Sequence, residues 1–316
     1  MRKHILFLTT IPPGPGFGPP VLNYRHLNRL QGWRISIIAE RRLAQKTYAI
    51  PKSWEVILLS TSLHWWPQKL SFLISECERI FNKEKPSAIL NHFGTNSIFA
   101  YHLSKRWDIP LSIMLHDQWE IWVKSWVERF YMRRGWDKII LNHASRIWTY
   151  SRELADIYPV QNCAKIKIIR PIPEGNSARF FTEWRDEFKK NPVVAFAGSF
   201  RLHEVKYFKI VASALDKIGG KLILTTTKNS IVKILLKGLS NVEFREPTSD
   251  NESLIRFLKE RASCLLVPWC FELDKLPWRK FGFPSKFSEF IQIGLPVIIL
   301  APQGVPISNC KRWWDF

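Results

Sequence analysis

The sequence predicts an α/β protein built from two tandem doubly wound lobes. Short apolar runs alternate with helix-length amphipathic segments along the 316 residues, which is typical of parallel sheets covered by helices on both faces. The series starts anew at Val193–Ala197, and each lobe opens with an apolar strand followed by a glycine-containing loop. Ligands of open α/β sheets bind beyond the carboxyl ends of the strands, so we expect the functional site in a cleft between the lobes.

The first lobe is expected over residues 1–170. Its strands are the short apolar runs Ile5–Thr9, Ile35–Ala39, Val56–Ser60, Ala88–Asn91, Leu111–Leu115, Arg146–Thr149 and Lys165–Ile169. Amphipathic spacing predicts helices near 21–31, 68–84, 95–106 and 118–135.

A change of character over residues 171–190, rich in proline, glycine and charge, predicts the connection between the lobes. The second lobe is expected over 191–316, with strands at Val193–Ala197, Lys221–Thr225, Val242–Phe244, Cys264–Val267 and Val297–Leu300. Its helices are expected near 204–217, 229–237, 252–261 and 285–293. The chain stops about sixteen residues after the last strand, so we expect an incomplete second lobe.

The formal net charge of +20 favours anionic partners, namely nucleic acid, acidic lipid headgroups or phosphorylated substrates. Charge alone does not choose among them. The 15 tryptophans suit a water–lipid boundary when they stand beside Lys and Arg, although most of them are expected in the core.

The five cysteines are scattered and form no Cys-x-x-Cys pair, which favours reduced thiols in the cytoplasm and no zinc site. The apolar run Ile5–Leu8 is too short for a signal-peptide core, and no stretch reaches the roughly 18 apolar residues of a spanning helix. A cytoplasmic protein, with a peripheral position on the inner face of the membrane left open, is expected.

The loop after the first strand contains Gly16 and Gly18, which can bring the backbone close to a ligand. Its spacing and its prolines do not match a dinucleotide-binding fingerprint. We treat it as an acceptor or cleft loop, with a simple tight turn as the alternative.

Gly198-Ser199-Phe200-Arg201 stands in the equivalent position of the second lobe, with Lys206 just beyond. Free N–H groups at the start of a helix, together with Arg201 and Lys206, could bind a diphosphate. The alternative is that both cations are merely solvated.

The stretch from Phe283 to Val297 is the most informative part of the chain. Pro284 suits the first turn of a helix and Gly294 its end. Lys286 and Glu289 are three residues apart and share one helix face, so one turn can offer a cation for phosphate and a carboxylate for ribose hydroxyls. Taken alone, the two residues would be interpreted as an ordinary surface ion pair.

Pro284-Ser285-Lys286, then Glu289, then Gly-x-Pro-Val resembles the donor-binding helix of the family-4-type glycosyltransferases of the GT-B fold. Gly198 and the cations after it resemble that family's phosphate loop, and Thr149-Tyr150-Ser151 resembles the serine-containing turn of its acceptor lobe. The resemblance extends over residues 1–300 and is most specific at 283–297.

The resemblance implies donor-binding roles for particular residues. Glu289 matches the second glutamate of the family's pair, which holds the donor ribose, and Phe281 stands eight residues earlier, where the family has the first. The phosphate would be bound by Lys286, Arg201 and Lys206, and Arg279 would reach the donor from the preceding loop, with Gly198, Ser199 and Ser285 completing the donor-binding set.

His116 and Asp117 follow the fifth strand and face the expected cleft. A histidine there can donate a hydrogen bond to a sugar hydroxyl, and the aspartate could orient it or act as a base, so this pair is the candidate catalytic set. Similar glycosyltransferases often carry His-Asp at this place. His92, after the fourth strand, is a weaker cleft candidate, because a lone histidine is more often structural.

Four aromatic residues with helical spacing follow His116, and four cations surround them: Trp119, Trp122, Trp126 and Phe130, with Lys124, Arg129, Arg133 and Arg134. Such a helix could lie in an acidic membrane surface and deliver a lipid-linked acceptor. Packing of the stripe against its own lobe is an equal alternative.

Together these features predict transfer of a sugar from a nucleotide-diphosphate donor to a glycan or lipid-linked acceptor, in the synthesis of a cell-surface polysaccharide or glycolipid. No cofactor is expected, and no Asp-x-Asp metal site is present in the sequence. The family resemblance favours retention of the anomeric configuration. The alternatives are a nucleotide-sugar epimerase, an inactive donor-binding protein of the same fold, and a basic nucleic-acid-binding protein.

Overall fold

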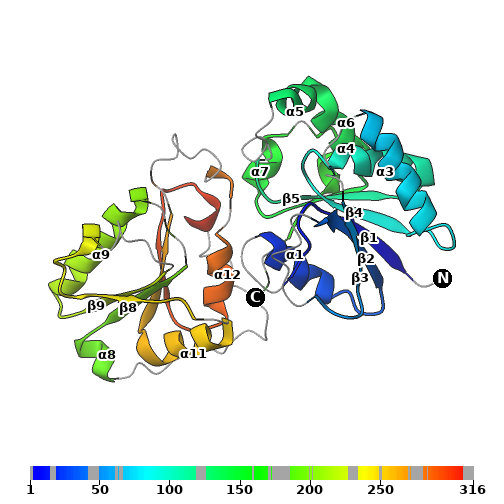
Figure 1. Ribbon diagram of the computed structural model, residues 1–316. Helices are drawn as coiled ribbons and strands as arrows, with labels where there is room; N and C mark the ends of the chain where they lie inside the picture. Colours follow the sequence, from blue (N-terminus) through cyan, green and yellow to red (C-terminus); the bar gives the residue numbers. More distant parts are fainter. Residues whose placement is uncertain are drawn as a thin grey trace. The chain divides into compact units, whose positions relative to one another are not determined.

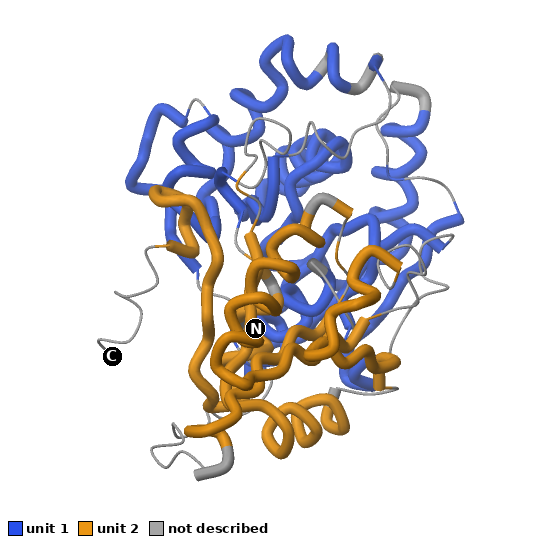
Figure 2. The backbone as a smooth tube through the Cα atoms, turned by 90° about the vertical axis from the view of Figure 1, so that its left-hand side faces the viewer, with its two compact units in different colours: residues 1–172, 280–283 blue, residues 173–279, 284–316 orange. Residues whose placement is uncertain are grey.

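The structure is a computed structural model that holds two parallel sheets flanked by helices (Figure 1). It describes residues 3–14, 19–41, 50–60, 63, 67–118, 126–158, 160–169, 172, 186–198, 200, 202–226, 234–248, 251–269, 271, 280–282 and 284–308. The chain forms two compact units, unit 1 with residues 1–172 and 280–283, and unit 2 with residues 173–279 and 284–316 (Figure 2).

Unit 1 contains a seven-stranded parallel sheet in the order β3-β2-β1-β4-β5-β6-β7. The strands are β1 (His4–Leu8), β2 (Arg34–Glu40), β3 (Glu55–Leu59), β4 (Ala88–His92), β5 (Leu111–Leu115), β6 (Arg146–Thr149) and β7 (Ile166–Ile168). Its described helices include α1 (Pro19–Asn28), α3 (Pro67–Ile80), α4 (Ser97–Trp107), α5 (Trp126–Tyr131), α6 (Asp137–His143) and α7 (Arg152–Asp156).

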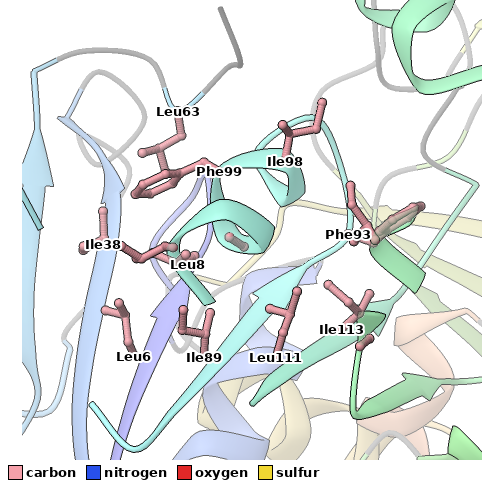
Figure 3. Close-up of a cluster of buried hydrophobic side chains, with 14 of the residues drawn as sticks. Leu6, Leu8, Ile38, Leu63, Ile89, Phe93, Ile98, Phe99, Leu111 and Ile113 are labelled. Atoms are coloured by element: carbon pink, nitrogen blue, oxygen red, sulfur yellow. The ribbon is translucent and has the colours of Figure 1, made fainter. Parts of the chain in front are cut away.

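Both faces of this sheet are buried, which is why its central strands are apolar almost throughout. Successive side chains of a strand point to opposite faces. Leu6 and Leu8 of β1 lie in one cluster with Ile98 and Phe99 of α4 (Figure 3), and side chains of α3 belong to the same cluster. Phe7 packs with Leu27 of α1 in another cluster. Helices on both faces hold the sheet rigid, and its carboxyl edge is left to carry polar side chains.

Unit 2 contains a five-stranded parallel sheet in the order β10-β9-β8-β11-β12. The strands are β8 (Val193–Ala197), β9 (Lys221–Thr225), β10 (Val242–Arg245), β11 (Cys264–Pro268) and β12 (Val297–Leu300). Its described helices include α8 (Asp186–Lys190), α9 (Val205–Asp216), α11 (Asn251–Arg261) and α12 (Ser285–Ile291). Phe196 of β8 and Phe208 of α9 are fully buried, with ring centroids 5.0 Å apart, and anchor this core.

The α/β class with two doubly wound sheets is confirmed, and every expected strand is present within a residue or two of its expected bounds. The short helix α8 occupies the end of the stretch 171–190, and most of that stretch lies outside the described residues. The helix expected near 229–237 also begins outside them. Among the described helices, none is both long and apolar enough to cross a bilayer.

The helix expected over 118–135 is helical from Trp126 onward where the structure describes it, but it is not α-helical to its end. After α5 the chain forms a π-helical turn, Met132–Trp136, and then α6. Gly135 inside that turn has φ of 112°, which a right-handed helix does not accommodate, so the axis kinks there. Residues 119–125 lie outside the description.

Candidate functional site

Three neighbouring strands of unit 1 place aromatic and imidazole rings together at their carboxyl ends. His92 ends β4, His116 follows β5 and Tyr150 follows β6. The ring of His116 lies edge-on to both neighbours, with centroid distances of 4.6 Å to His92 and 4.7 Å to Tyr150. The Tyr150 hydroxyl oxygen is 3.5 Å from His116 Nε2, a long hydrogen bond.

A small hydrogen-bond network holds the turn that presents His92. Ser97 Oγ donates to Asn91 Oδ1 at 2.5 Å and accepts from the backbone N–H of Gly94 at 2.9 Å. Asn91 Nδ2 donates to the carbonyl oxygen of Leu8 at 3.0 Å, which ties the end of β4 to β1. The first turn of α4 is therefore fixed to the strand that it follows.

Burial keeps these histidines neutral. Desolvation lowers the pKa of His92 to about 4 and that of His116 well below its usual value. The rings of His26, from α1, and Tyr150 lie 6.4 Å apart, and burial lowers the pKa of His26 to about 4 as well. A neutral imidazole carries one donor and one acceptor, so this cluster can hydrogen-bond a sugar hydroxyl without bringing a charge.

Asp117 follows His116 and is half-buried. Burial, and secondarily the nearby Asp117 carboxylate, raise the pKa of the Tyr150 hydroxyl far above its usual range. Tyr150 is therefore a neutral donor at any physiological pH. The sequence-predicted His92, His116 and Asp117 thus come together, and His26 and Tyr150, which sequence reasoning missed, join them.

In unit 2 the structure brings the glycine loop and the predicted donor helix into contact. Gly198 follows β8 with φ of 123°, a conformation that favours glycine, and its N–H donates to the carbonyl oxygen of Thr225 at 2.9 Å. A methyl group built on Gly198 would lie 2.5 Å from Lys286 Cε and 2.9 Å from Lys286 Nζ. The absence of a side chain at Gly198 is what lets the lysine cross the loop.

Lys286 comes from the first turn of α12, whose start is set by Pro284 with φ of −69°. Its Nζ lies 4.2 Å from the centroid of the Phe196 ring, a cation–π contact in which the aromatic face stabilises the ammonium. The ammonium is thereby held over the loop at the carboxyl end of β8, the central strand of its sheet.

Glu289 lies one turn further along α12 and is half-buried. Gln292 Nε2 donates to Glu289 Oε2 at 3.2 Å, which restricts the orientation of the carboxylate. Lys206 is exposed near the start of α9, with its Nζ 5.2 Å from the centroid of the Tyr207 ring. Only the backbone of Ser285 is described. The remaining predicted site residues lie outside the described part of the chain: Gly16, Gly18, Ser199, Arg201 and Arg279.

We compared the chain with known proteins to identify its fold. No family model matches the sequence, and no curated protein matches it. Among solved structures, sucrose-phosphate synthase from Thermosynechococcus elongatus superimposes with a TM-score of 0.63 at 15% identity, over 94% of this chain and 81% of the other. The protein has the GT-B fold.

Two further structures show the range of this likeness. HepE of Anabaena, solved in complex with UDP-glucose, gives a TM-score of 0.59 at 15% identity over 95% of this chain and 81% of its own. A putative UDP-N-acetylglucosamine 2-epimerase from Listeria monocytogenes gives 0.52 at 13% identity over 98% and 82%. At such identities the likeness establishes the architecture, and the chemistry rests on the residues.

Proposed function

We propose that this protein is a glycosyltransferase that uses a nucleotide-diphosphate sugar as its donor. One observation carries the proposal: the Lys286 ammonium is held over Gly198, in the loop that follows the central strand of the unit 2 sheet. A positive φ, a close approach and a cation at the carboxyl end of a parallel sheet are the features that a diphosphate needs.

The chemistry follows from the charges. The bond between the anomeric carbon and the diphosphate oxygen breaks, and the leaving diphosphate gains negative charge that Lys286 stabilises. The acceptor hydroxyl oxygen bonds to the anomeric carbon, and its proton passes to a phosphate oxygen or to Asp117. Glu289 binds the ribose hydroxyls, and His116 contacts the sugar. We propose that the reaction needs no cofactor or metal and proceeds with retention, and that its acceptor is a glycan or a lipid-linked sugar of a surface polysaccharide or glycolipid.

Titration calorimetry with a panel of nucleotide sugars tests this function. We expect one donor to bind and Lys286→Met to weaken its binding about 100-fold, because an ammonium close to a diphosphate contributes roughly 2 to 3 kcal/mol. Lys209→Met, which removes an exposed lysine of α9, is the matched control and should bind like the wild type. Equal affinity for wild type and Lys286→Met would disprove the proposed donor site.

An epimerase is the second candidate, because the structure titled a putative UDP-N-acetylglucosamine 2-epimerase, from Listeria monocytogenes, has a similar fold. Product analysis separates the two. A transferase forms a glycoside and free nucleoside diphosphate only when an acceptor is supplied. An epimerase converts the donor sugar without one, and that outcome would replace the proposal.

We further propose that α5 and α6 place the protein on an acidic membrane surface. Trp126, Phe130 and Ile139 are 76%, 43% and 45% exposed, so a large part of each side chain faces solvent. Among the described side chains of this segment, Met132, Ile140 and Leu141 belong to the core cluster, and Trp136 packs against it.

Cations surround these exposed side chains. Arg129, Arg133, Arg134 and Lys138 are exposed on the same segment, and the Arg134 guanidinium lies 4.2 Å from the centroid of the Phe130 ring. Exposed aromatic residues among cations are the composition that binds anionic lipid at an interface.

Co-sedimentation with vesicles tests the membrane position. We expect binding to vesicles with anionic lipid, weaker binding to zwitterionic ones, and a loss of at least tenfold for the double variant Trp126→Ser, Phe130→Ser. The matched control, Ile210→Ser with Ile218→Ser, removes two exposed apolar side chains of unit 2 and should bind normally. Equal binding by both double variants would refute this position.

A further inference from the structure

The chain takes an unusual path just before α12. Residues 280–283 belong to unit 1, although the chain on both sides of them belongs to unit 2. Four residues of the second half of the sequence therefore complete the first unit. The same four residues directly precede the helix that carries Lys286 and Glu289.

Two contacts fix this segment on unit 1. Ser151 Oγ donates a hydrogen bond of 2.7 Å to the carbonyl oxygen of Phe281. The Phe281 side chain packs against the main apolar cluster of unit 1. Backbone and side chain are thus held at one position, and the adjacent Gly282 is buried.

Ser151 is itself tightly constrained. It is 4% exposed and caps α7, because its Oγ accepts the backbone N–H of Leu154 at 3.1 Å. The Ser151 hydroxyl therefore accepts a hydrogen bond from α7 and donates one to Phe281, so the side chain at this position must be both donor and acceptor. Its rotation is fixed by the cap, so the bond to Phe281 has a defined direction.

We propose that Ser151 and Phe281 are positioning residues for the donor-binding helix. Phe281 precedes Lys286 by five residues, and Pro284 restricts the chain between them. Holding the Phe281 backbone limits the conformations open to the first turn of α12, and so lowers the entropy that Lys286 loses when a diphosphate binds.

This inference rests on the proposed function and revises what the sequence motif implied at one residue. The family resemblance implies a glutamate where Phe281 stands. The packed Phe281 ring shows that the position serves as an apolar anchor in this chain. A carboxylate placed against that cluster would lose hydration without a partner.

Hydrogen exchange and donor titration on the full chain test the anchor. We expect Ser151→Ala and Phe281→Ala to speed exchange in α12 by at least tenfold and to weaken donor binding about tenfold, with kcat changed less than threefold. Ser151→Thr keeps the hydroxyl and should restore both readouts. Asn162→Ala is the control for the loss of a helix cap alone, because Asn162 Oδ1 accepts from the Ala164 N–H in another capped turn of unit 1. It should change neither exchange in α12 nor donor binding.

Phe281→Glu supplies the sharpest contrast. The anchor predicts faster exchange in α12 and weaker donor binding, whereas tighter donor binding with unchanged exchange would overturn the proposal. Unchanged exchange in Ser151→Ala and Phe281→Ala would also overturn it. Lys286→Met keeps the two proposals apart: if it binds donor normally the proposed function fails, while the exchange data still decide the anchor.

Discussion

The two units present opposite kinds of polar chemistry at the carboxyl ends of their strands. Unit 1 gathers His26, His92, His116 and Tyr150, which burial keeps neutral. Unit 2 holds a charged ammonium over a glycine loop. The difference indicates that the two units have separate roles: a neutral cluster suits an uncharged sugar, and a cation suits a diphosphate. Each prediction below tests one side of that division of roles.

Acidification gives the largest expected effect. The pKa of His92 is about 4 in the folded protein, below the 6.5 of an exposed histidine, so between these values only the unfolded chain binds the proton. The free energy of unfolding should fall as the pH drops from 6.5 to 4, by about 3 kcal/mol for each such histidine, and level off below. Denaturant unfolding at several pH values measures this fall.

His92→Phe is the variant that checks the assignment. It removes one titrating group and should flatten the acid limb by about 1.4 kcal/mol per pH unit, because one proton no longer separates the two states. An acid limb as steep as that of the wild type would show that His92 is not a neutral buried group.

His116→Leu tests the division of roles directly. The change removes both ring nitrogens and keeps an apolar filling, so kcat should fall about 100-fold, or roughly 2.7 kcal/mol, while the donor Kd stays within twofold. His102→Leu on α4, outside the cluster, is the control. A donor Kd that weakens as much as kcat falls would break the division.

Gly198→Ala should weaken donor binding about 20-fold, equivalent to roughly 1.8 kcal/mol. The added methyl group strains a backbone with φ of 123° and displaces Lys286. Gly238→Ala carries similar strain, with φ of 97°, but meets nothing within 4 Å and should leave donor binding unchanged. Calorimetry on both variants separates strain from displacement, and equal losses would contradict the role of Lys286.

Tyr150→Phe gives the smallest expected effect. Its hydroxyl lies 3.5 Å from His116 Nε2, well beyond the usual 2.7 to 2.8 Å for a strong hydroxyl bond, so kcat should fall only about twofold. Steady-state kinetics measure it. A loss above tenfold would mean that the hydroxyl itself contacts the substrate.

The strands and the two-lobed class were predictable because each buried parallel strand has its own local sequence pattern, a short β-branched and aliphatic run such as Ile35–Ala39. Gly198 and Lys286 were each singled out as well, since each stands at a recognisable boundary between a strand or loop and a helix, but the contact between them was not predicted.

What escaped prediction depends on distant packing. His26 and Tyr150 join the cluster only because α1 and β6 meet the same edge of the sheet, and no local pattern records that. The π-helical turn at Met132–Trp136 was not predicted from the amphipathic spacing. Phe281 was interpreted as a missing carboxylate because its partner Ser151 is 130 residues away in the sequence.

That separation has a consequence for biosynthesis. A ribosome adding about 5 to 20 residues per second needs on the order of ten seconds to travel from Ser151 to Phe281. During that interval the apolar surface of unit 1 that Phe281 covers is exposed, and Ser151 Oγ lacks the carbonyl oxygen to which it donates. A chain truncated after residue 172 would never receive residues 280–283. We expect such a chain to aggregate and to depend on chaperones.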